Sequence, residues 1–555
     1  MNLRTGANGR GWVIGSCLAS LVVAVPVLVV FSSVFRSSDG EWNHLAETLL
    51  PTYVFNTGVL AAGVCLVAGI VGVSTAWILT NCSFPGARIL GWAQLLPLSV
   101  PAYLSAYAMA DLLQFSGPVQ EWLRGSFGLQ AGDYWFPPIR SLGGAVYVLS
   151  FALYPYVYFA ARMAFQEQSR SLLEAGRLLG RGPFTTFWFV ALPLARPAIV
   201  GGVMLVMMET VADFGAVDHL AVDTFATGIY RTRFALESPV AASQLSATLL
   251  SALFLLVGVE WCLRRRRRYH RTGNRGNRGP GGRLGPVGSI LAFVACVVPV
   301  LLGFVIPTGR LLQLAIARGD ARGGGMLAGI AFDTVWLSLI ASVIAVLLAL
   351  IIGYAARLRR GLRTAGPATI ARAGYAIPGP VIALGLLVPL GWIDHRINDG
   401  WTLAFGDDWR PGLVLTGSVM AMLIGYQTRF LAVSLSFVQS GFQRIHRNID
   451  DAARTLGSGP GRSLVAVHLP LLRRSLLIAG LVVFVDVAKE LPMTLMLRPF
   501  NFDTLAIRVY ELASDERLEE AATAAILIVV IGLIPAWLLV GQLESNDDTH
   551  RNPDG

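Results

Sequence analysis

The sequence predicts an all-α membrane protein with about twelve transmembrane helices in two tandem repeats of six. Three observations support this fold class. Of the 555 residues, 54% are hydrophobic and only 14% are charged, whereas a soluble domain carries about 25% charged residues. Mostly apolar segments long enough to span a bilayer recur along the chain, and lipid excludes open sheet edges. Finally, sequence features of the first half return in the second half at a fixed distance.

The apolar segments place the helices. In the first half we expect them at about residues 12–35, 56–79, 90–114, 141–163, 197–218 and 242–263. In the second half we expect them at about residues 286–308, 331–356, 368–391, 412–437, 473–496 and 520–541. Between the halves, a Gly-, Arg- and Asn-rich composition predicts a flexible tether. The predicted domains are a first six-helix repeat at 1–263 (core 50–263), a linker at 264–285, a second repeat at 286–545 and a polar tail at 546–555.

The repeat keeps a constant register over most of its length. Pro101 corresponds to Pro378, and both prolines are expected to kink or interrupt their spans. Farther along, the register changes slightly, and Asp223-Thr224-Phe225-Ala226 corresponds to Asp503-Thr504-Leu505-Ala506. Duplication predicts two similar bundles with a pathway between them. Because each repeat has an even number of spans, the axis relating them should run along the membrane normal.

The placement of arginines predicts the orientation. Arg264–Arg268 open the linker, and arginines also gather before the fifth and eleventh spans. Since cytoplasmic loops carry the excess of positive charge, these loops and both termini are expected to lie in the cytoplasm. The net charge of +10 has the same explanation. We therefore expect a lipid bilayer around the chain and no nucleic-acid partner.

A duplicated motif occupies the loops before the fifth and eleventh spans. Its first copy reads Glu174-Ala175-Gly176-x₃-Gly180-x₉-Val190-x-Leu192-Pro193, and its second copy, in the register of the two prolines, reads Asp451-Ala452-Ala453-x₃-Gly457-x₉-Val467-x-Leu469-Pro470. Each copy predicts a short helix that begins with an acidic residue, ends at glycine, and is followed by an apolar stretch leading into the next span. Small residues let a partner backbone approach. Such a helical hairpin can enter a groove on a soluble protein.

These residues resemble the EAA loop of the permease subunits of ABC importers. The resemblance implies the type I ABC importer permease fold and a role for each loop as a coupling helix seated in a cytoplasmic ATPase. The departures from the family pattern are mild: Gly176 replaces Ala, Val190 and Val467 replace Ile, and Asp451 replaces Glu. The last change shortens the side chain, so the two docking sites are not expected to be equivalent. The implied coupling residues are Glu174, Ala175, Gly176, Gly180, Leu192 and Pro193, with Asp451, Ala452, Ala453, Gly457, Leu469 and Pro470. Two interfacial helices without a partner would not explain the repeated Gly and Leu-Pro spacing.

Motifs of catalysis are missing from the sequence. No G-x-x-x-x-G-K-[ST], H-E-x-x-H or G-x-S-x-G pattern occurs, so we expect no catalytic residues, no metal site and no cofactor on this chain. ATP and magnesium would be used by a separate ATPase. The histidines show no metal-ligand spacing, and His468 is expected on the surface of the second loop.

Two fused six-helix halves resemble the ferric-iron type of permease, and also the thiamine type. Leu96–Tyr103 and Glu209–Val217 look like ferric permeases in particular. The resemblance implies two copies of a cytoplasmic ABC ATPase, an extracytoplasmic substrate-binding protein and a place in the inner membrane of a bacterium. A secondary transporter is a rival that needs no ATPase, and an intramembrane enzyme would need a catalytic constellation that the sequence does not show.

Charged residues also fall inside or near predicted spans. Glu209 and Asp213 correspond to Asp486 and Glu490. A charge in hydrocarbon is costly, so such residues usually face protein or a water-filled path. We predict that the four carboxylates line the pathway or a gate; the alternative is that Lys489 pairs with Asp486 or Glu490 and stabilises packing.

Overall fold

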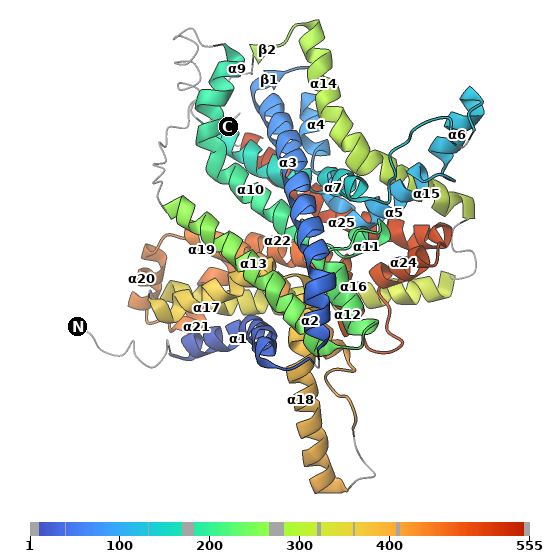
Figure 1. Ribbon diagram of the computed structural model, residues 1–555. Coiled ribbons are helices and arrows are strands. Elements are labelled where there is room, and N and C mark those ends of the chain that lie inside the picture. Colours follow the sequence, from blue (N-terminus) through green and yellow to red (C-terminus); the bar gives the residue numbers. More distant parts are fainter. Residues whose placement is uncertain are drawn as a thin grey trace. The chain divides into compact units, whose positions relative to one another are not determined.

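The computed structural model describes residues 10–38, 40–130, 132–168, 182–265, 282–318, 324–358, 361–406 and 411–548. Within these ranges the chain is almost entirely helical (Figure 1). The only strands there are β1 (Cys82–Ser83) and β2 (Gly282–Arg283), which pair in parallel. The all-α fold class predicted from the sequence is therefore confirmed.

The helices of the first half begin with α1 near the N-terminus and end with α13. Their bounds are α1 Arg10–Ser32, α2 Glu41–Thr48, α3 Leu50–Asn81, α4 Ala87–Ala93, α5 Ala102–Leu113, α6 Pro118–Phe127, α7 Leu142–Glu167, α9 Pro183–Thr186, α10 Leu192–Ala212, α11 Gly215–His219, α12 Phe225–Phe234 and α13 Pro239–Arg265. Shorter helical turns are η1 Ser33–Phe35, η2 Leu96–Ser99 and η3 Phe187–Ala191.

The second half runs from α14 to α25. Its helices are α14 Pro286–Val300, α15 Ile306–Arg318, α16 Gly324–Leu358, α17 Leu362–Ala373, α18 Gly379–Phe405, α19 Val419–Arg444, α20 Asn448–Thr455, α21 Pro460–Ser463, α22 Leu469–Ala488, α23 Pro492–Leu497, α24 Leu505–Ser514 and α25 Leu518–Asp548. The turns η4 Leu301–Val305, η5 Gly374–Ala376 and η7 Leu464–His468 complete it.

The tandem repeat is visible in the helix boundaries. Both ends of α7 reappear in α19 in the register that relates Pro101 to Pro378, and α9 is related to α21 in the same way. Helices α12 and α24 are related by the slightly larger spacing that also relates Asp223–Ala226 to Asp503–Ala506. The sequence duplication therefore produces matching helices.

Nine helices in the described part of the chain are long and apolar enough to cross a membrane, and a bent pair makes a tenth. That pair, Ala87–Ser99 with Ala102–Phe127, bends by 92° where Pro101 was expected to interrupt a span. Helix α22 is not among them; it contains Arg473, Arg474 and Asp486. Helix α25 is not among them either, and the exposure of its side chains is described only to residue 534. Twelve spans stays a prediction.

The chain forms two compact units. Unit 1 comprises Met1–Leu45, Gly228–Leu250 and Asp320–Glu511, and unit 2 comprises Ala46–Thr227, Ser251–Gly319 and Leu512–Gly555. In unit 1, helices α16, α19 and α22 pack on one another; in unit 2, their repeat equivalents α3, α7 and α10 do the same. Gly72 permits this packing in α3, because a Cβ there would lie 2.8 Å from the backbone nitrogen of Tyr158 in α7.

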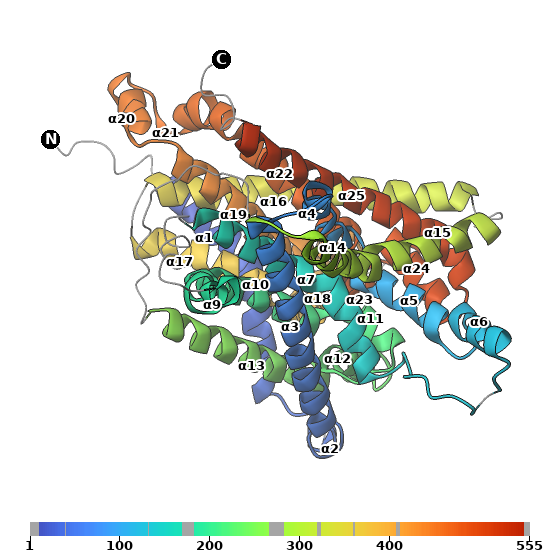
Figure 2. The same ribbon diagram turned by 90° about the horizontal axis from the view of Figure 1, so that it is seen from above.

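Each unit contains the first span of the other repeat. In unit 1, α1 packs against α16, α17 and α18, and Thr428 Oγ1 donates a hydrogen bond to the carbonyl of Val22 at 3.0 Å. In unit 2, α15 lies beside α25 (Figure 2), and Gly303 of η4 packs against the backbone of Phe151. Packing units and sequence repeats are thus different divisions of the chain. The predicted boundaries of repeats, linker and tail describe the repeats and stay a prediction.

Candidate coupling loops and membrane carboxylates

The second duplicated loop is a helical hairpin between α19 and α22 (Figure 2). Helix α20 comes first, and Asp450 and Asp451 occupy its first turn, where the positive end of the helix dipole favours them. After the bend, α21 begins at Pro460 and continues through η7 into α22. We call residues 451–470 the second coupling loop and residues 174–193 the first.

Gly457 makes the bend of the second coupling loop. Its φ is +74°, in the left-handed region that only glycine adopts without strain. The N–H of Gly457 donates to the carbonyl of Arg454 at 3.0 Å, and the N–H of Ser458 donates to that of Ala453 at 2.9 Å. This pair of bonds is a Schellman motif, which satisfies carbonyls that the helix end would otherwise leave unpaired. The motif requires glycine here for its backbone conformation.

The Leu-Pro pairs of both loops follow a π-helical turn. In η7 the N–H of Leu469 donates to the carbonyl of Leu464, five residues earlier, and in η3 that of Leu192 donates to Phe187. Proline has no N–H, and its ring clashes with the carbonyl four residues before it. A wider turn removes this clash. Pro193 and Pro470 can therefore stand in a continuous helix that joins each loop to its span.

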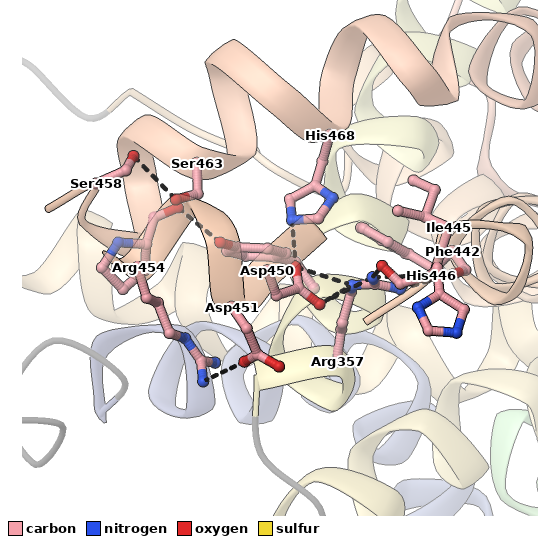
Figure 3. A network of polar contacts seen from close by, with 12 residues as sticks. Arg357, Phe442, Ile445, His446, Asp450, Asp451, Arg454, Ser458, Ser463 and His468 are labelled. Atoms are coloured by element: carbon pink, nitrogen blue, oxygen red, sulfur yellow. Dashed lines mark hydrogen bonds and ion pairs between the residues drawn. The ribbon is translucent and has the colours of Figure 1, made fainter. Parts of the chain in front are cut away.

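A charged cluster fixes α20 to the neighbouring helices (Figure 3). Asp450 Oδ2 accepts from Nε and Nη2 of Arg357, at 3.0 and 2.8 Å, and Asp450 Oδ1 accepts from His468 Nε2 at 2.8 Å. Arg357 also donates to the carbonyls of Phe442 at 2.6 Å and Ile445 at 3.1 Å, at the end of α19. We call Arg357, Asp450 and His468 the charged anchor.

His468 is buried, and the expectation of a surface position was wrong. Its side chain is 1% exposed and packs against the rings of Tyr354 and Phe442. Burial lowers the pKa of His468 below its ordinary value; Asp450 opposes this shift and Arg357 supports it. Within the described residues, Nδ1 has no hydrogen-bond partner, so a second proton would gain no acceptor. His468 is thus a neutral donor.

The opposite face of the second coupling loop is exposed. The side chains of Asp451 and Arg454 form an ion pair while remaining 70% and 55% exposed. Leu456, at the tip, is 87% exposed, and Ala452 is also exposed, whereas Ala453 is buried. Apolar and charged groups on one small helix, backed by a fixed inner face, suit docking to a protein groove.

Only the end of the first coupling loop is described. Glu174, Ala175, Gly176 and Gly180 lie outside the described residues. From residue 182 onward, α9 and η3 lead to Leu192 and Pro193 at the start of α10. The rings of Trp77, Phe165 and Phe187 pack together here, with Trp77 at 5.3 and 5.0 Å from the other two.

Two of the predicted membrane carboxylates end their spans as helix caps. Asp213 Oδ1 accepts from the N–H groups of Ala216 and Val217, at the start of α11. Glu490 accepts from the N–H groups of Met493 and Thr494, and from the hydroxyl of Thr494, in α23. Each carboxylate therefore stabilises a break between a span and a short helix.

The other two carboxylates lie one turn earlier. Asp486 pairs with Lys489 at 2.9 Å, as the packing alternative expected, and Glu209 is half-buried in α10. Glu490 also faces Arg429 of α19 at 3.8 Å, both side chains being buried. Glu209 and Asp213 belong to unit 2, whereas Asp486 and Glu490 belong to unit 1. The pathway role of the four carboxylates stays a prediction. In the described part of the chain, no three His, Cys, Asp or Glu residues are placed to hold a metal ion.

Sequence reasoning missed the charged anchor. The motif pointed to Asp451, whereas its neighbour Asp450 makes the inward contacts. Arg357 and Tyr354 lie in another helix, far away in sequence, so no local pattern indicated that they contact this loop. Arg429 was also missed, although an arginine inside an apolar span is a signal in itself.

The apolar helices and the repeated loop motif together are typical of a membrane transport subunit. Residues 11–268 match the family described as "Binding-protein-dependent transport system inner membrane component". Over 532 residues the chain is 24% identical to the Fe(3+)-transport system permease protein FbpB 2 of Haemophilus influenzae, covering 94% of this chain and 96% of that protein. The family match covers the first repeat, and the similarity to the iron permease extends over both repeats.

Two further relatives match a shorter part of the chain. The sulfate transport system permease protein CysT of Escherichia coli is 26% identical over 246 residues, which are 43% of this chain and 86% of that protein. The molybdenum transport system permease protein ModB of the same species is 30% identical over 145 residues, 26% of this chain and 60% of that protein. The relatives of this chain are thus permeases named for different inorganic ions.

Proposed function

We propose that this chain is the membrane permease of an ATP-driven importer for ferric iron delivered by an extracytoplasmic binding protein. The observation that carries the proposal is the similarity to the Fe(3+) permease, which extends through both repeats and covers 94% of this chain. The sulfate and molybdenum permeases match shorter parts of it. Ferric iron is therefore favoured over thiamine.

The two coupling loops would each seat in one copy of a cytoplasmic ATPase. The exposed face of α20, with Asp451, Arg454 and Leu456, supports this for the second loop, and the repeated Gly and Leu-Pro spacing supports it for the first. ATP and magnesium would be bound by the ATPase, and this chain would bind no cofactor. The bacterial inner membrane would hold the chain with both termini in the cytoplasm.

Transport would follow from a change of access. ATP binds the closed ATPase dimer better than the open one, and this difference in affinity shifts the permease between its two states. The π turns keep each coupling loop continuous with the span that follows, so a displacement of the loop reaches α10 or α22. At the other end of these spans, Asp213 and Glu490 cap the breaks before α11 and α23, where we place the gate.

The test is reconstitution in proteoliposomes with the ATPase and binding protein that form a complex with this chain. Expected is uptake of radiolabelled ferric iron that needs ATP, the ATPase and the binding protein, while thiamine is not taken up. Uptake driven by an ion gradient with no ATPase present would overturn the importer assignment. ATP-dependent uptake of thiamine, sulfate or molybdate but not iron would overturn the cargo alone.

For the gate, Asp213→Asn and Glu490→Gln should each reduce uptake while the complex still binds the ATPase. Full uptake by the doubly substituted protein would remove these carboxylates from the pathway.

A further inference from the structure

We propose that Arg357, Asp450 and His468 are positioning residues that fasten the second coupling loop to its bundle, and that the described part of the first loop, residues 182–193, is held in a different way. The two loops then contribute unequally to energy coupling. This inference rests on the proposed function, because it concerns how the loops transmit the motion of an ATPase.

The charged anchor connects four segments, three of them directly through one guanidinium. Arg357 comes from the end of α16 and donates both to Asp450 in α20 and to backbone carbonyls at the end of α19. Asp450 in turn accepts from His468 in the π turn before α22. The planar, multiply donating guanidinium suits this arrangement, whereas a lysine ammonium has three donors on a flexible stem. The position of α20 is thereby tied to α16, α19 and α22 together.

Burial makes these contacts strong. The side chains of Arg357 and Asp450 are 9% and 18% exposed, and that of His468 is 1% exposed. Ion pairs and hydrogen bonds shielded from water are screened little by salt, and breaking one leaves a buried charge without its partner. A second contact reinforces the anchor: the Tyr354 hydroxyl donates to the carbonyl of Pro460 at 2.7 Å, across the bend.

The first repeat cannot form the same cluster. At the corresponding positions, in the register of the duplicated motif, it has Thr80, Leu173 and Ala191 in place of Arg357, Asp450 and His468. Thr80 Oγ1 donates within its own helix, to the carbonyl of Ala76 at 2.7 Å.

Aromatic packing and one neutral hydrogen bond, from Gln168 Nε2 to the carbonyl of Ala191 at 2.9 Å, take the place of the charged contacts in the described part of the first loop. The rings of Trp77, Phe165 and Phe187 gather there. Apolar contacts are non-directional, so they permit small sliding movements that a bidentate charged contact resists. The second loop should therefore follow its bundle rigidly, and the first should follow with more freedom.

The first experiment measures the anchor without any partner. Hydrogen exchange of the amides of residues 446–458 is followed in the full chain in lipid nanodiscs. Arg357→Ala should reduce protection by about tenfold or more, as expected when a buried donor is removed. Arg357→Lys should fall between it and the original chain, and Asp450→Asn should resemble Arg357→Ala. Thr80→Ala, at the equivalent position, should leave this segment unchanged.

The second experiment measures coupling in the reconstituted complex with the ATPase and binding protein. Expected is a several-fold fall in ferric iron taken up per ATP hydrolysed for Arg357→Ala, with partial recovery for Arg357→Lys and no change for Thr80→Ala. Recovery by the conservative variant separates positioning from simple loss of folding.

The outcomes separate the two proposals. If the unmodified complex takes up nothing with ATP, the proposed function fails, whatever the exchange data show. If it transports and Arg357→Ala keeps the same uptake per ATP, or Thr80→Ala lowers it equally, the unequal anchoring is overturned. Unchanged exchange in Arg357→Ala overturns the anchor itself.

Discussion

Replacing Gly457 by alanine should destabilise the bend of the second coupling loop through backbone strain alone. Gly457 has φ = +74°, and a Cβ built there meets no other heavy atom within 4 Å. No steric overlap therefore adds to the cost. An L-residue in the left-handed region costs about 1–2 kcal/mol, which changes the ratio of ordered to open loop by roughly 5- to 30-fold.

Gly459 provides the control in the same loop. It has φ = −71° and ψ = 164°, an extended conformation open to any residue, and its Cβ would also meet nothing within 4 Å. Gly459→Ala should therefore change stability by less than about 0.5 kcal/mol. At position 457, asparagine should cost less than alanine because it tolerates the left-handed region, and valine should cost more.

Amide exchange at Gly457 and Ser458 is the direct assay, since both N–H groups donate to α20 carbonyls. Exchange should accelerate in the order Asn, Ala, Val at position 457, and uptake per ATP should fall in the same order. Equal exchange for Gly457→Val and Gly459→Val would refute the argument from φ. If exchange is faster while uptake stays complete, Gly457 stabilises the bend but the bend has no role in coupling.

Three further predictions concern His468, a close helix contact and a buried carboxylate. Burial lowers the pKa of His468 below its ordinary 6.5, so the folded loop binds a proton less well than the unfolded one. Its stability is full above that ordinary value and declines as the pH falls below it. The protection factors of the α20 amides, which correct for the intrinsic pH dependence of exchange, should fall accordingly, and His468→Gln should flatten this profile. A profile unchanged by the substitution would contradict the assignment. Gly72→Ala should destabilise the packing of α3 by about 1–3 kcal/mol, because its Cβ would lie 2.8 Å from a backbone nitrogen of α7. Gly69→Ala is the control, since the nearest contact of its Cβ would be at 3.9 Å. Equal midpoints of thermal unfolding for the two variants would refute the contact. Asp394 is fully buried and accepts hydrogen bonds from the N–H and hydroxyl of Thr416. Asp394→Ala should therefore lower the stability by about 1–3 kcal/mol and make residues 411–418 accessible to protease. Unchanged cleavage would show that these bonds do not hold the segment.

The repeat and the bend could be predicted because their causes are local. A constant register between the halves predicts that equivalent segments form equivalent helices, and α7 and α19 do match at both ends. Glycine before a new apolar stretch predicts the end of a helix, and Gly457 ends α20 in the left-handed conformation. Proline within an apolar run predicts an interruption, found at Pro101.

Long-range contacts were beyond reach from a single sequence. The fifth and eleventh predicted spans continued past Asp213 and Glu490, because nothing local showed that these carboxylates would cap a new helix. His468 appeared to be a surface residue because its partners, Arg357 and Tyr354, lie in α16, more than a hundred residues before it. Burial of a polar side chain depends on such distant partners, which hydrophobic periodicity does not reveal.

The exchange of first spans between the units has a consequence for biosynthesis. Helix α1 leaves the ribosome well before its packing partners α16, α17 and α18, which appear only after the rest of the first repeat and the linker have been made. During that interval α1 must remain in the bilayer without these partners. A gene severed within the linker would give each product a helix that belongs in the other's bundle, so neither could mature until both were present.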